Sequence, residues 1–313
     1  MTSVGTRSPR SRIGYAGQQA KRHADDGPST PRPEPRTHDP SQPAENSFSV
    51  GTADVGGLPF HRLSEHEVVA FIMARLDEGC GGWMVNPNVD VLRQVAHDPE
   101  LVKLAGQADL CVADGMPVIW ASRLSNQPLP QRVAGSTLIR TLCEKAARHG
   151  KSVFLLGASP DVAECCRERL QREIEGLEVV GTCSPPVGFE RDSKQDQVIY
   201  SALNKKVPDI VFCAFGFPKQ EKLMALLSQL FPHSWFIGSG ASLDFVSGRI
   251  RRAPRWMQAS GLEWAYRLKC EPRRLLRRYL VNDLPFAVHL LLLSAVRGWR
   301  QRASASRTTV ETT

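Results

Sequence analysis

The stretch SVFLLGASPDVAECCRERLQREI, residues 152–174, decides the fold class. It begins with the apolar run 153–156, passes through Gly157, and continues with Pro160 and Asp161 in the first turn of a helical segment. Proline and an acidic residue are both favoured at the start of a helix. A buried strand followed by a glycine and such a helix is the first part of a βαβ unit.

Strand-like and helix-like segments alternate on both sides of this stretch. We expect strands at 82–85, 108–113, 152–157, 177–183, 208–214 and 234–238. We expect helices at 66–79, from about 89, and at 136–150, 159–174, 196–206 and 218–230, with a Ser/Thr cap on the helix at 136–150. This alternation predicts an α/β fold with a Rossmann-like, mainly parallel sheet flanked by helices.

Composition divides the chain into four parts. Residues 1–56 include GPSTPRPEPRTHDPSQPAENS, which is too poor in apolar residues to form a core, so we expect a disordered tail. We place a folded domain at 57–260, a basic appendage at 261–300 and a second disordered tail at 301–313. The N-terminal segment lacks the apolar core of a secretory signal, which predicts a cytoplasmic protein.

The net charge of +8 favours anionic partners. The eight cysteines form no CxxC pair, and most stand in apolar runs, so they are interpreted as small buried residues in a reducing compartment. No metal site is predicted from their spacing.

Polar residues and glycines stand where predicted strands end or helices begin. They are Asn86, Asn88, Asp114, Arg132, Gly157, Lys219, Gln220 and Asp244. Each alone is a weak signal, and Asp114 taken by position alone is equally well a turn residue. Because ligands bind beyond the carboxyl ends of parallel strands, together they predict one convergent pocket. The LLGASPD segment fits neither GxGxxG nor GxxxxGK[ST], so neither a dinucleotide site nor a P-loop is supported.

Residues 249–280 hold nine arginines and one lysine against two glutamates, with Trp256 and Trp264 between them. A helix from Pro272 would carry an apolar stripe flanked by arginines, which is typical of membrane-surface helices. The stripe is Leu275, Leu276, Tyr279 and Leu280, and the flanks are Arg273, Arg274, Arg277 and Arg278.

The apolar run at 284–296 follows this helix. Its core of about a dozen residues is short of the roughly 20 that span a bilayer, so we expect it to lie on the surface. Trp299 and Arg297 would then stand at the lipid headgroups. The alternative is a solvated basic helix docked on its own domain.

Several motifs occur together and in order. They are NPNVDVL, VADGMPVIW, RVAGSTLI, VFLLGAS, IVFCAFGFPKQE, GSGASLDFVSGRIRRAPRWMQ and GLEWAYRLKCEPRRLLRRYL. Over about 60–282 the chain resembles the WecG/TagA/CpsF glycosyltransferases, glycosyltransferase family 26. The N-terminal tail is outside the resemblance.

The resemblance implies a GT-E fold and an inverting, metal-independent hexosyltransferase without a cofactor. It implies transfer from a UDP-sugar to a polyprenyl-pyrophosphate-linked acceptor at the inner membrane face, in the synthesis of surface polysaccharide such as capsule, exopolysaccharide, enterobacterial-type antigen or teichoic acid. The chain has no DxD motif, which agrees with metal independence.

The family's catalytic base matches Asp114, and Arg132 and Gln220 match residues of the catalytic site. The remaining expected positions bind the donor, with Asp244 at the uridine and the arginines of the appendage at the phosphates. They are Asn86, Asn88, Gly157, Asp244, Arg267, Arg274 and Arg277.

Two other classes would use the same charge or the same fold. A basic nucleic-acid-binding α/β protein lacks support because the sequence has no helix-turn-helix, zinc-finger or RNA-binding aromatic motif. A nicotinamide oxidoreductase lacks its glycine fingerprint. The sequence leaves open the sugar (N-acetylmannosamine, its uronic acid or glucose), the acceptor, the pathway and whether a homo-oligomer forms.

Overall fold

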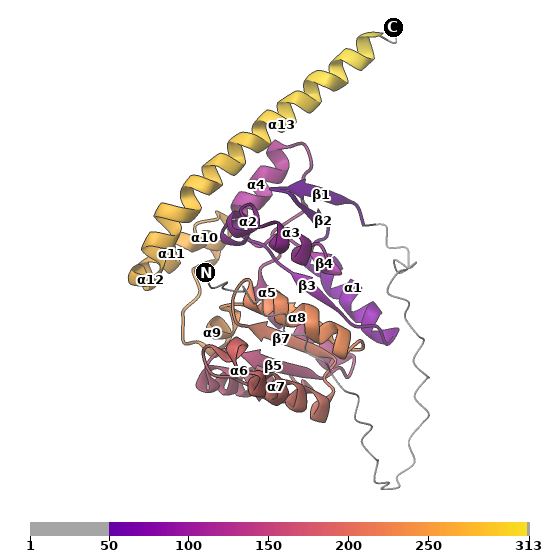
Figure 1. The fold of residues 1–313 in the computed structure, drawn as a ribbon, viewed down its shortest axis with the longest axis vertical. Helices are drawn as coiled ribbons and strands as arrows, with labels where there is room; N and C mark the ends of the chain where they lie inside the picture. The colour runs from indigo at the N-terminus through magenta and orange to yellow at the C-terminus, as the bar shows by residue number, and fades with distance from the viewer. Residues whose placement is uncertain (1–49, 312–313) are drawn as a thin grey trace, which may run out of the picture. The chain divides into compact units, whose positions relative to one another are not determined.

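The structure is a computed structural model, and it describes residues 50–311. Its centre is a six-stranded, all-parallel sheet in the order β4-β3-β8-β7-β5-β6 (Figure 1). The strands are β3 (Gly82–Val85), β4 (Leu110–Cys111), β5 (Val153–Gly157), β6 (Val179–Cys183), β7 (Ile210–Ala214) and β8 (Trp235–Gly238). The predicted α/β class with a mainly parallel sheet is confirmed.

Helices cover both faces of this sheet because side chains along a strand alternate between the two faces. Phe154 and Leu156 belong to one buried cluster, whereas Val153 and Leu155 belong to the other. The helices of the first cluster are α2 (Val89–Val95), α3 (Pro99–Ala105), α4 (Met116–Leu124), α7 (Ser193–Lys206) and α8 (Lys219–Leu230). Those of the second are α1 (Glu65–Asp77), α5 (Gly135–Arg148), α6 (Pro160–Glu173) and α9 (Ser242–Ser247). A short 3₁₀ turn, η1 (Phe189–Arg191), precedes α7.

An antiparallel hairpin precedes α1, formed by β1 (Thr52–Val55) and β2 (Leu58–His61). Its first strand lies inside the segment that we assigned to the tail, so ordered structure begins before position 57. The missed signal is a two-glycine turn between short runs that alternate buried and exposed residues. The rest of the predicted tail, residues 1–49, lies outside the described residues.

The expected Ser/Thr cap on α5 is wrong. The residue before the helix is Ala134, which makes no side-chain cap, and Thr137 lies inside the first turn. The hydroxyl of Thr137 instead donates to Glu65 at 2.8 Å, and that of Thr141 donates to the same carboxylate at 2.7 Å. These hydroxyls therefore attach α5 to the start of α1.

The appendage is helical. It begins after the short helix α10 (Arg255–Ala259) and consists of α11 (Glu263–Cys270), α12 (Pro272–Leu276), a π-helical segment η2 (Arg277–Asp283) and α13 (Leu284–Glu311). The helical run Pro272–Ser304 is long and apolar enough to cross a membrane by length and composition alone, and 22% of its most apolar window is buried in the protein. The length of this helical run therefore does not exclude spanning of a membrane. The short apolar core at 284–296 had led us to expect that it would. The helix also continues past position 300, where we expected a disordered tail.

One face of α13 packs on the domain, over α4 (Figure 1). The buried positions are Ala287, Leu290, Ser294 and Gly298, at helical spacing. Asn126 donates its side-chain amide to the Gly298 carbonyl at 2.9 Å, and Arg297 pairs with Asp54 at 3.0 Å. The helix is thus docked on its own domain, as the alternative interpretation required.

The other face of this helical run is apolar and exposed. Its members are Leu276, Leu280, Val281, Leu284, Val288, Leu292, Leu293, Val296 and Trp299. An exposed apolar surface of this extent marks a site of interaction with a protein or a membrane. Docking and a free apolar face therefore occur together in one segment.

Gly298 makes the close approach of α13 to α4 possible, because an added Cβ would lie 1.9 Å from the Leu124 carbonyl oxygen. We expect Gly298→Ala to push α13 away from α4 and to increase protease cleavage within α13. Leu293→Ala, on the exposed face, is the matched control and should keep the wild-type cleavage pattern. Equal cleavage of Gly298→Ala and wild type would show that this contact does not hold the helix.

Candidate active site

A cavity of about 600 Å³ lies at the carboxyl edge of the sheet, between the strand ends and the appendage. Most of the predicted site residues line it: Asn86, Asn88, Asp114, Arg132, Gln220, Asp244, Arg267 and Arg274. The structure therefore brings together residues that are up to 188 positions apart, counted from Asn86 to Arg274.

Gly157 and Arg277 do not line the cavity. Gly157 has φ +99°, and a Cβ there would lie 2.7 Å from the Ala214 carbonyl oxygen, so this glycine lets the ends of β5 and β7 approach closely. Arg277 is exposed, and its neighbour Arg278 lines the cavity instead. Both residues lie at the start of the π-helical segment, Arg277–Asp283.

Asp114 lies in the turn between β4 and α4. Its N–H donates to the Pro87 carbonyl at 3.0 Å, which fixes the turn beside the end of β3. The pKa of Asp114 is raised to about 6, mainly by burial and to a lesser degree by the nearby Glu263 carboxylate. Arg132, Arg267 and Arg252 oppose this rise. A carboxylate with this pKa is ionised at neutral pH and is basic enough to accept a proton from a substrate.

Arg132 is bound to the appendage. Its Nη1 donates to Glu263 Oε2 at 2.9 Å, and the other carboxylate oxygen, Oε1, lies 3.5 Å from Arg252 Nε. The side chains of Arg132 and Glu263 are only 16% and 14% exposed, so this ion pair is shielded from solvent. Nothing in the local sequence around Arg132 indicates this partner.

Gln220 is held at both ends of its amide. The Gly216 N–H donates to Oε1 at 3.3 Å, and Nε2 donates to Glu221 Oε1 at 2.8 Å. A Cβ at Gly238 would lie 2.6 Å from this nitrogen, so the glycine makes room for the amide at the end of β8. The Gln220 side chain is therefore oriented before any ligand binds.

Glu221 is a cavity residue that the sequence analysis missed. It is 2% exposed, and burial raises the pKa of its carboxyl to about 7. Its Oε2 atom is buried and has no hydrogen-bond partner among the described residues. The signal was helical periodicity, because Glu221 stands three residues before the buried Met224 and so shares its face of α8.

The appendage supplies positive charge to the other side of the cavity. Arg267 stacks over the Phe245 ring at 5.4 Å, and its buried Nε atom has no hydrogen-bond acceptor among the described residues. Arg274 pairs with Glu271 at 2.9 Å. Burial raises the pKa of Asp244, while Arg249, Arg274 and Arg267 oppose the rise. Bidentate guanidinium groups in such a position suit phosphate oxygens.

A second charge cluster attaches η2 to α2. Arg278 lies 2.9 Å from Asp90 and 3.6 Å from Asp283, and Arg93 lies 2.7 Å and 3.4 Å from the same two carboxylates. Burial raises the pKa of Asp283 to about 6, and the adjacent Asp90 adds to the rise. Asp90, Asp283 and Arg278 line the cavity and were also missed by the sequence analysis.

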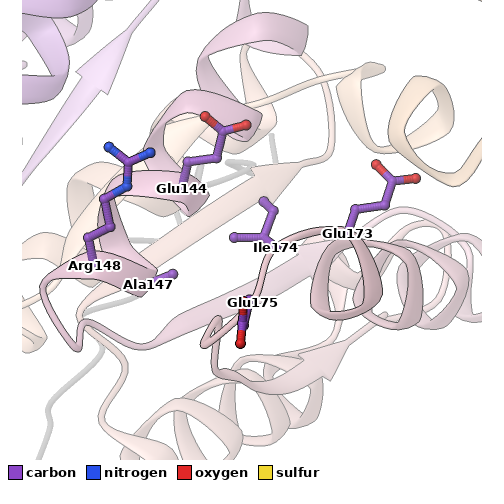
Figure 2. Close-up of a pocket in the computed structure, with 6 residues that line it drawn as sticks. All are labelled: Glu144, Ala147, Arg148, Glu173, Ile174 and Glu175. Carbon is purple, nitrogen blue, oxygen red and sulfur yellow. The ribbon is translucent and has the colours of Figure 1, made fainter.

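A smaller hollow of about 240 Å³ lies elsewhere, between the last turns of α5 and α6 (Figure 2). Glu144, Arg148, Glu173 and Glu175 are among its lining residues. Since α5 ends just before β5 begins, this hollow lies toward the amino edge of the sheet, away from the strand ends that carry Asp114. Its three carboxylates would repel a phosphate.

The large cavity combines a basic carboxylate, oriented amides and several guanidinium groups. A carboxylate can accept the proton of an attacking hydroxyl. Guanidinium groups can stabilise the charge that develops on a phosphate leaving group. The arrangement therefore suits displacement of a phosphorylated leaving group by a hydroxyl.

Comparison with known proteins identifies relatives with this chemistry. Residues 53–301 match the model of the glycosyl transferase WecG/TagA/CpsF family. A protein from Bacillus spizizenii (strain ATCC 23059 / NRRL B-14472 / W23) is 33% identical over 199 residues, which are 64% of this chain and 75% of the relative. A protein from Bacillus subtilis (strain 168) is 31% identical over the same shares. Both are named N-acetylglucosaminyldiphosphoundecaprenol N-acetyl-beta-D-mannosaminyltransferase.

The raised pKa of Asp114 has a consequence for stability. The folded protein holds the proton of the Asp114 carboxyl group more tightly than the unfolded chain does, because an aspartate in the unfolded chain titrates near 3.8. Ionisation of Asp114 therefore lowers the stability of the folded protein as pH rises from about 4 to about 6. The cost remains above pH 6. We expect Asp114→Asn to raise the unfolding temperature relative to wild type above pH 6 and to have little effect near pH 4.

Thermal unfolding at a series of pH values measures this difference. Asp161→Asn, an exposed aspartate in the first turn of α6, serves as the control for a general loss of one negative charge. A gain for Asp114→Asn that is the same at every pH would contradict the raised pKa.

Proposed function

The chain belongs to the WecG/TagA/CpsF family of glycosyl transferases, and from that premise we propose that it moves a hexosyl group from a UDP-sugar to a polyprenyl-diphosphate-linked sugar. N-acetylmannosamine is the first choice of transferred sugar and N-acetylglucosamine of acceptor, because both relatives are named for this pair. The observation that carries the proposal is that the Asp114 carboxylate and the arginines of the appendage line one cavity at one edge of a parallel sheet.

The proposed reaction is a single displacement. Asp114 accepts the proton of the acceptor hydroxyl, and the hydroxyl oxygen attacks the anomeric carbon of the donor. The bond between that carbon and the diphosphate oxygen breaks, and UDP leaves with the electron pair. Attack from the face opposite to UDP inverts the configuration at the anomeric carbon.

The cavity side chains divide into two groups in this proposal. Arg267 and Arg274 balance the charge of the diphosphate. The buried Nε atom of Arg267, which has no acceptor among the described residues, would donate to it. Asn86 and Gln220 orient sugar hydroxyls at the strand ends, and Asp244 binds the uridine. Asn88 has a structural task as well, because its side chain accepts from the Val91 N–H at 3.2 Å and caps α2.

We expect Asp114→Asn to reduce the rate of transfer by about a hundredfold to ten-thousandfold, since it keeps the shape and removes the base. UDP release is measured at saturating UDP-N-acetylmannosamine with polyprenyl-diphosphate-linked N-acetylglucosamine. Glu144→Gln, at the hollow near the amino edge, is the control and should keep the wild-type rate.

Near wild-type turnover of Asp114→Asn would remove Asp114 as the base. A panel that includes UDP-N-acetylmannosaminuronic acid and UDP-glucose tests the choice of donor. If no donor in this panel gives UDP release in the presence of the acceptor, the proposed function is wrong. The nucleic-acid alternative has no supporting observation in the described part of the chain.

We further infer that the segment from Pro272 to Trp299 holds the enzyme at the cytoplasmic surface of the membrane. A polyprenyl-linked acceptor resides in the bilayer, whereas the UDP-sugar is dissolved in the cytoplasm. The exposed apolar face of this segment would enter the lipid, and the exposed Arg273 and Arg277 would meet anionic headgroups. The face packed on α4, which includes Gly298, supports surface attachment rather than spanning.

Attraction of basic residues to anionic lipid contributes about 1 kcal/mol each near the surface, so binding should be reversible and partly salt-dependent. We expect the protein to float with vesicles containing anionic lipid at low salt and to be released in part at high salt. Leu292→Asp, on the exposed face, should weaken flotation strongly, because it places a charge in the apolar surface.

Lys205→Ala, at the end of α7 on the catalytic domain, is the control and should float like wild type. If the wild-type protein stays at the bottom of the gradient with anionic vesicles at low salt, the proposed membrane surface is wrong.

A further inference from the structure

Glu263 connects α11 with two other segments of the chain, and one of them, at Arg132, is 131 positions away in sequence. It lies in the first turn of α11, and its two carboxylate oxygens face different arginines. Oε2 accepts from Arg132 in the loop before α5, and Oε1 faces Arg252 in the segment between α9 and α10. The two distances are 2.9 Å and 3.5 Å.

The environment of this carboxylate is enclosed. The side chains of Glu263, Arg132 and Arg252 are 14%, 16% and 22% exposed. The Nε and Nη2 atoms of Arg252 are buried and have no hydrogen-bond partner among the described residues. Removing one partner from a shielded ion pair leaves an uncompensated charge, which costs far more than losing a surface ion pair.

The same residues surround Asp114. The charged groups that act on its carboxylate are Arg132, Glu263, Arg267 and Arg252. Three of them are positive and come from the loop before α5, the segment between α9 and α10, and α11. Glu263 is the one negative group among them, so it offsets part of the positive field at the proposed base.

We propose that Glu263 is a positioning residue that holds Arg132 beside Asp114 and supplies the negative charge that balances the arginines around it. This inference rests on the proposed function, because it assigns Glu263 a task in that same site. Docking of α11 and completion of the catalytic surroundings are then one event. The appendage brings both the arginines for the leaving group and the carboxylate that limits their effect on the base.

The first test is the pH dependence of transfer. Glu263→Gln keeps the size and an acceptor oxygen that can still hold Arg132 in place, and it removes only the charge, so Asp114 should lose its proton at lower pH. The acidic limb of the rate profile should move down by about half a pH unit or more, as expected for loss of a neighbouring like charge. Arg252→Gln removes a positive charge and should move the same limb up.

Glu271→Gln is the matched control in the same appendage. Glu271 pairs with Arg274 and acts on Asp244, and it is not among the groups that act on Asp114. Whatever its effect on the maximal rate, the acidic limb should stay in place. A residue that only braces the fold would lower the rate at all pH values and leave the limb unmoved.

The second test needs no transferase activity. Thermal unfolding is measured over a range of pH for the wild type, Glu263→Gln and Arg252→Gln, each with and without the additional substitution Asp114→Asn. The difference within each pair reports the titration of Asp114 without substrate. We expect this titration to move down in Glu263→Gln and up in Arg252→Gln. If Glu263→Gln does not fold, Arg252→Gln carries both tests alone.

A downward shift in Glu263→Gln and an upward shift in Arg252→Gln, seen in both tests, support the proposal. Absence of a shift in the substrate-free titration overturns it, even if transfer is confirmed. If the substrate-free shifts occur but no UDP-sugar is consumed by the wild type, the proposed function fails while the role of Glu263 in setting the titration of Asp114 stands.

Discussion

The structure depends on the ion pairs that hold several arginine side chains beside the buried carboxylate of Asp114. A buried charge without a partner is costly, so each arginine at the cavity needs an anion or a solvent-exposed position. Arg132 and Arg252 share Glu263, Arg278 shares two aspartates with Arg93, and Arg274 pairs with Glu271. Arg267 instead stacks on an aromatic ring and keeps a buried nitrogen without an acceptor among the described residues.

These pairs explain how the appendage stays on the domain. α11 reaches the loop before α5 through Glu263, and η2 reaches α2 through Arg278 and Asp283. The parallel sheet supplies the fixed side of the site, because its strand ends place Asn86, Asp114 and Gln220 at one edge. The appendage supplies the charged side, and both sides contribute to the surroundings of Asp114.

Local patterns in the sequence predicted the sheet, its flanking helices and the polar residues at the strand ends that line the cavity. Apolar runs that end in polar residues are a short-range signal, and Asp114 and Gln220 stand at such ends. The ion pairs are not predictable in this way, because Arg132 and Glu263 are 131 residues apart and only the folded chain brings them together.

The other differences have equally specific causes. Gly157 was expected at the donor site, but its lack of a side chain serves the approach of β5 to β7. Arg277 was expected at the donor from the family resemblance, whereas Arg278, the next residue in the π-helical segment, lines the cavity. Glu221 was missed because charged residues at the start of a helix are usually exposed, whereas this one follows the buried face of α8.

The central claim is that the arginines of the docked appendage bind the diphosphate of a nucleoside diphosphate. Backbone hydrogen exchange with and without UDP measures this most directly. The account predicts slower exchange in α11 and α12 when UDP is bound. It predicts little change in α7, the helix that contacts β6 at the edge of the sheet. Equal exchange in α11 and α12 at saturating UDP would contradict the claim.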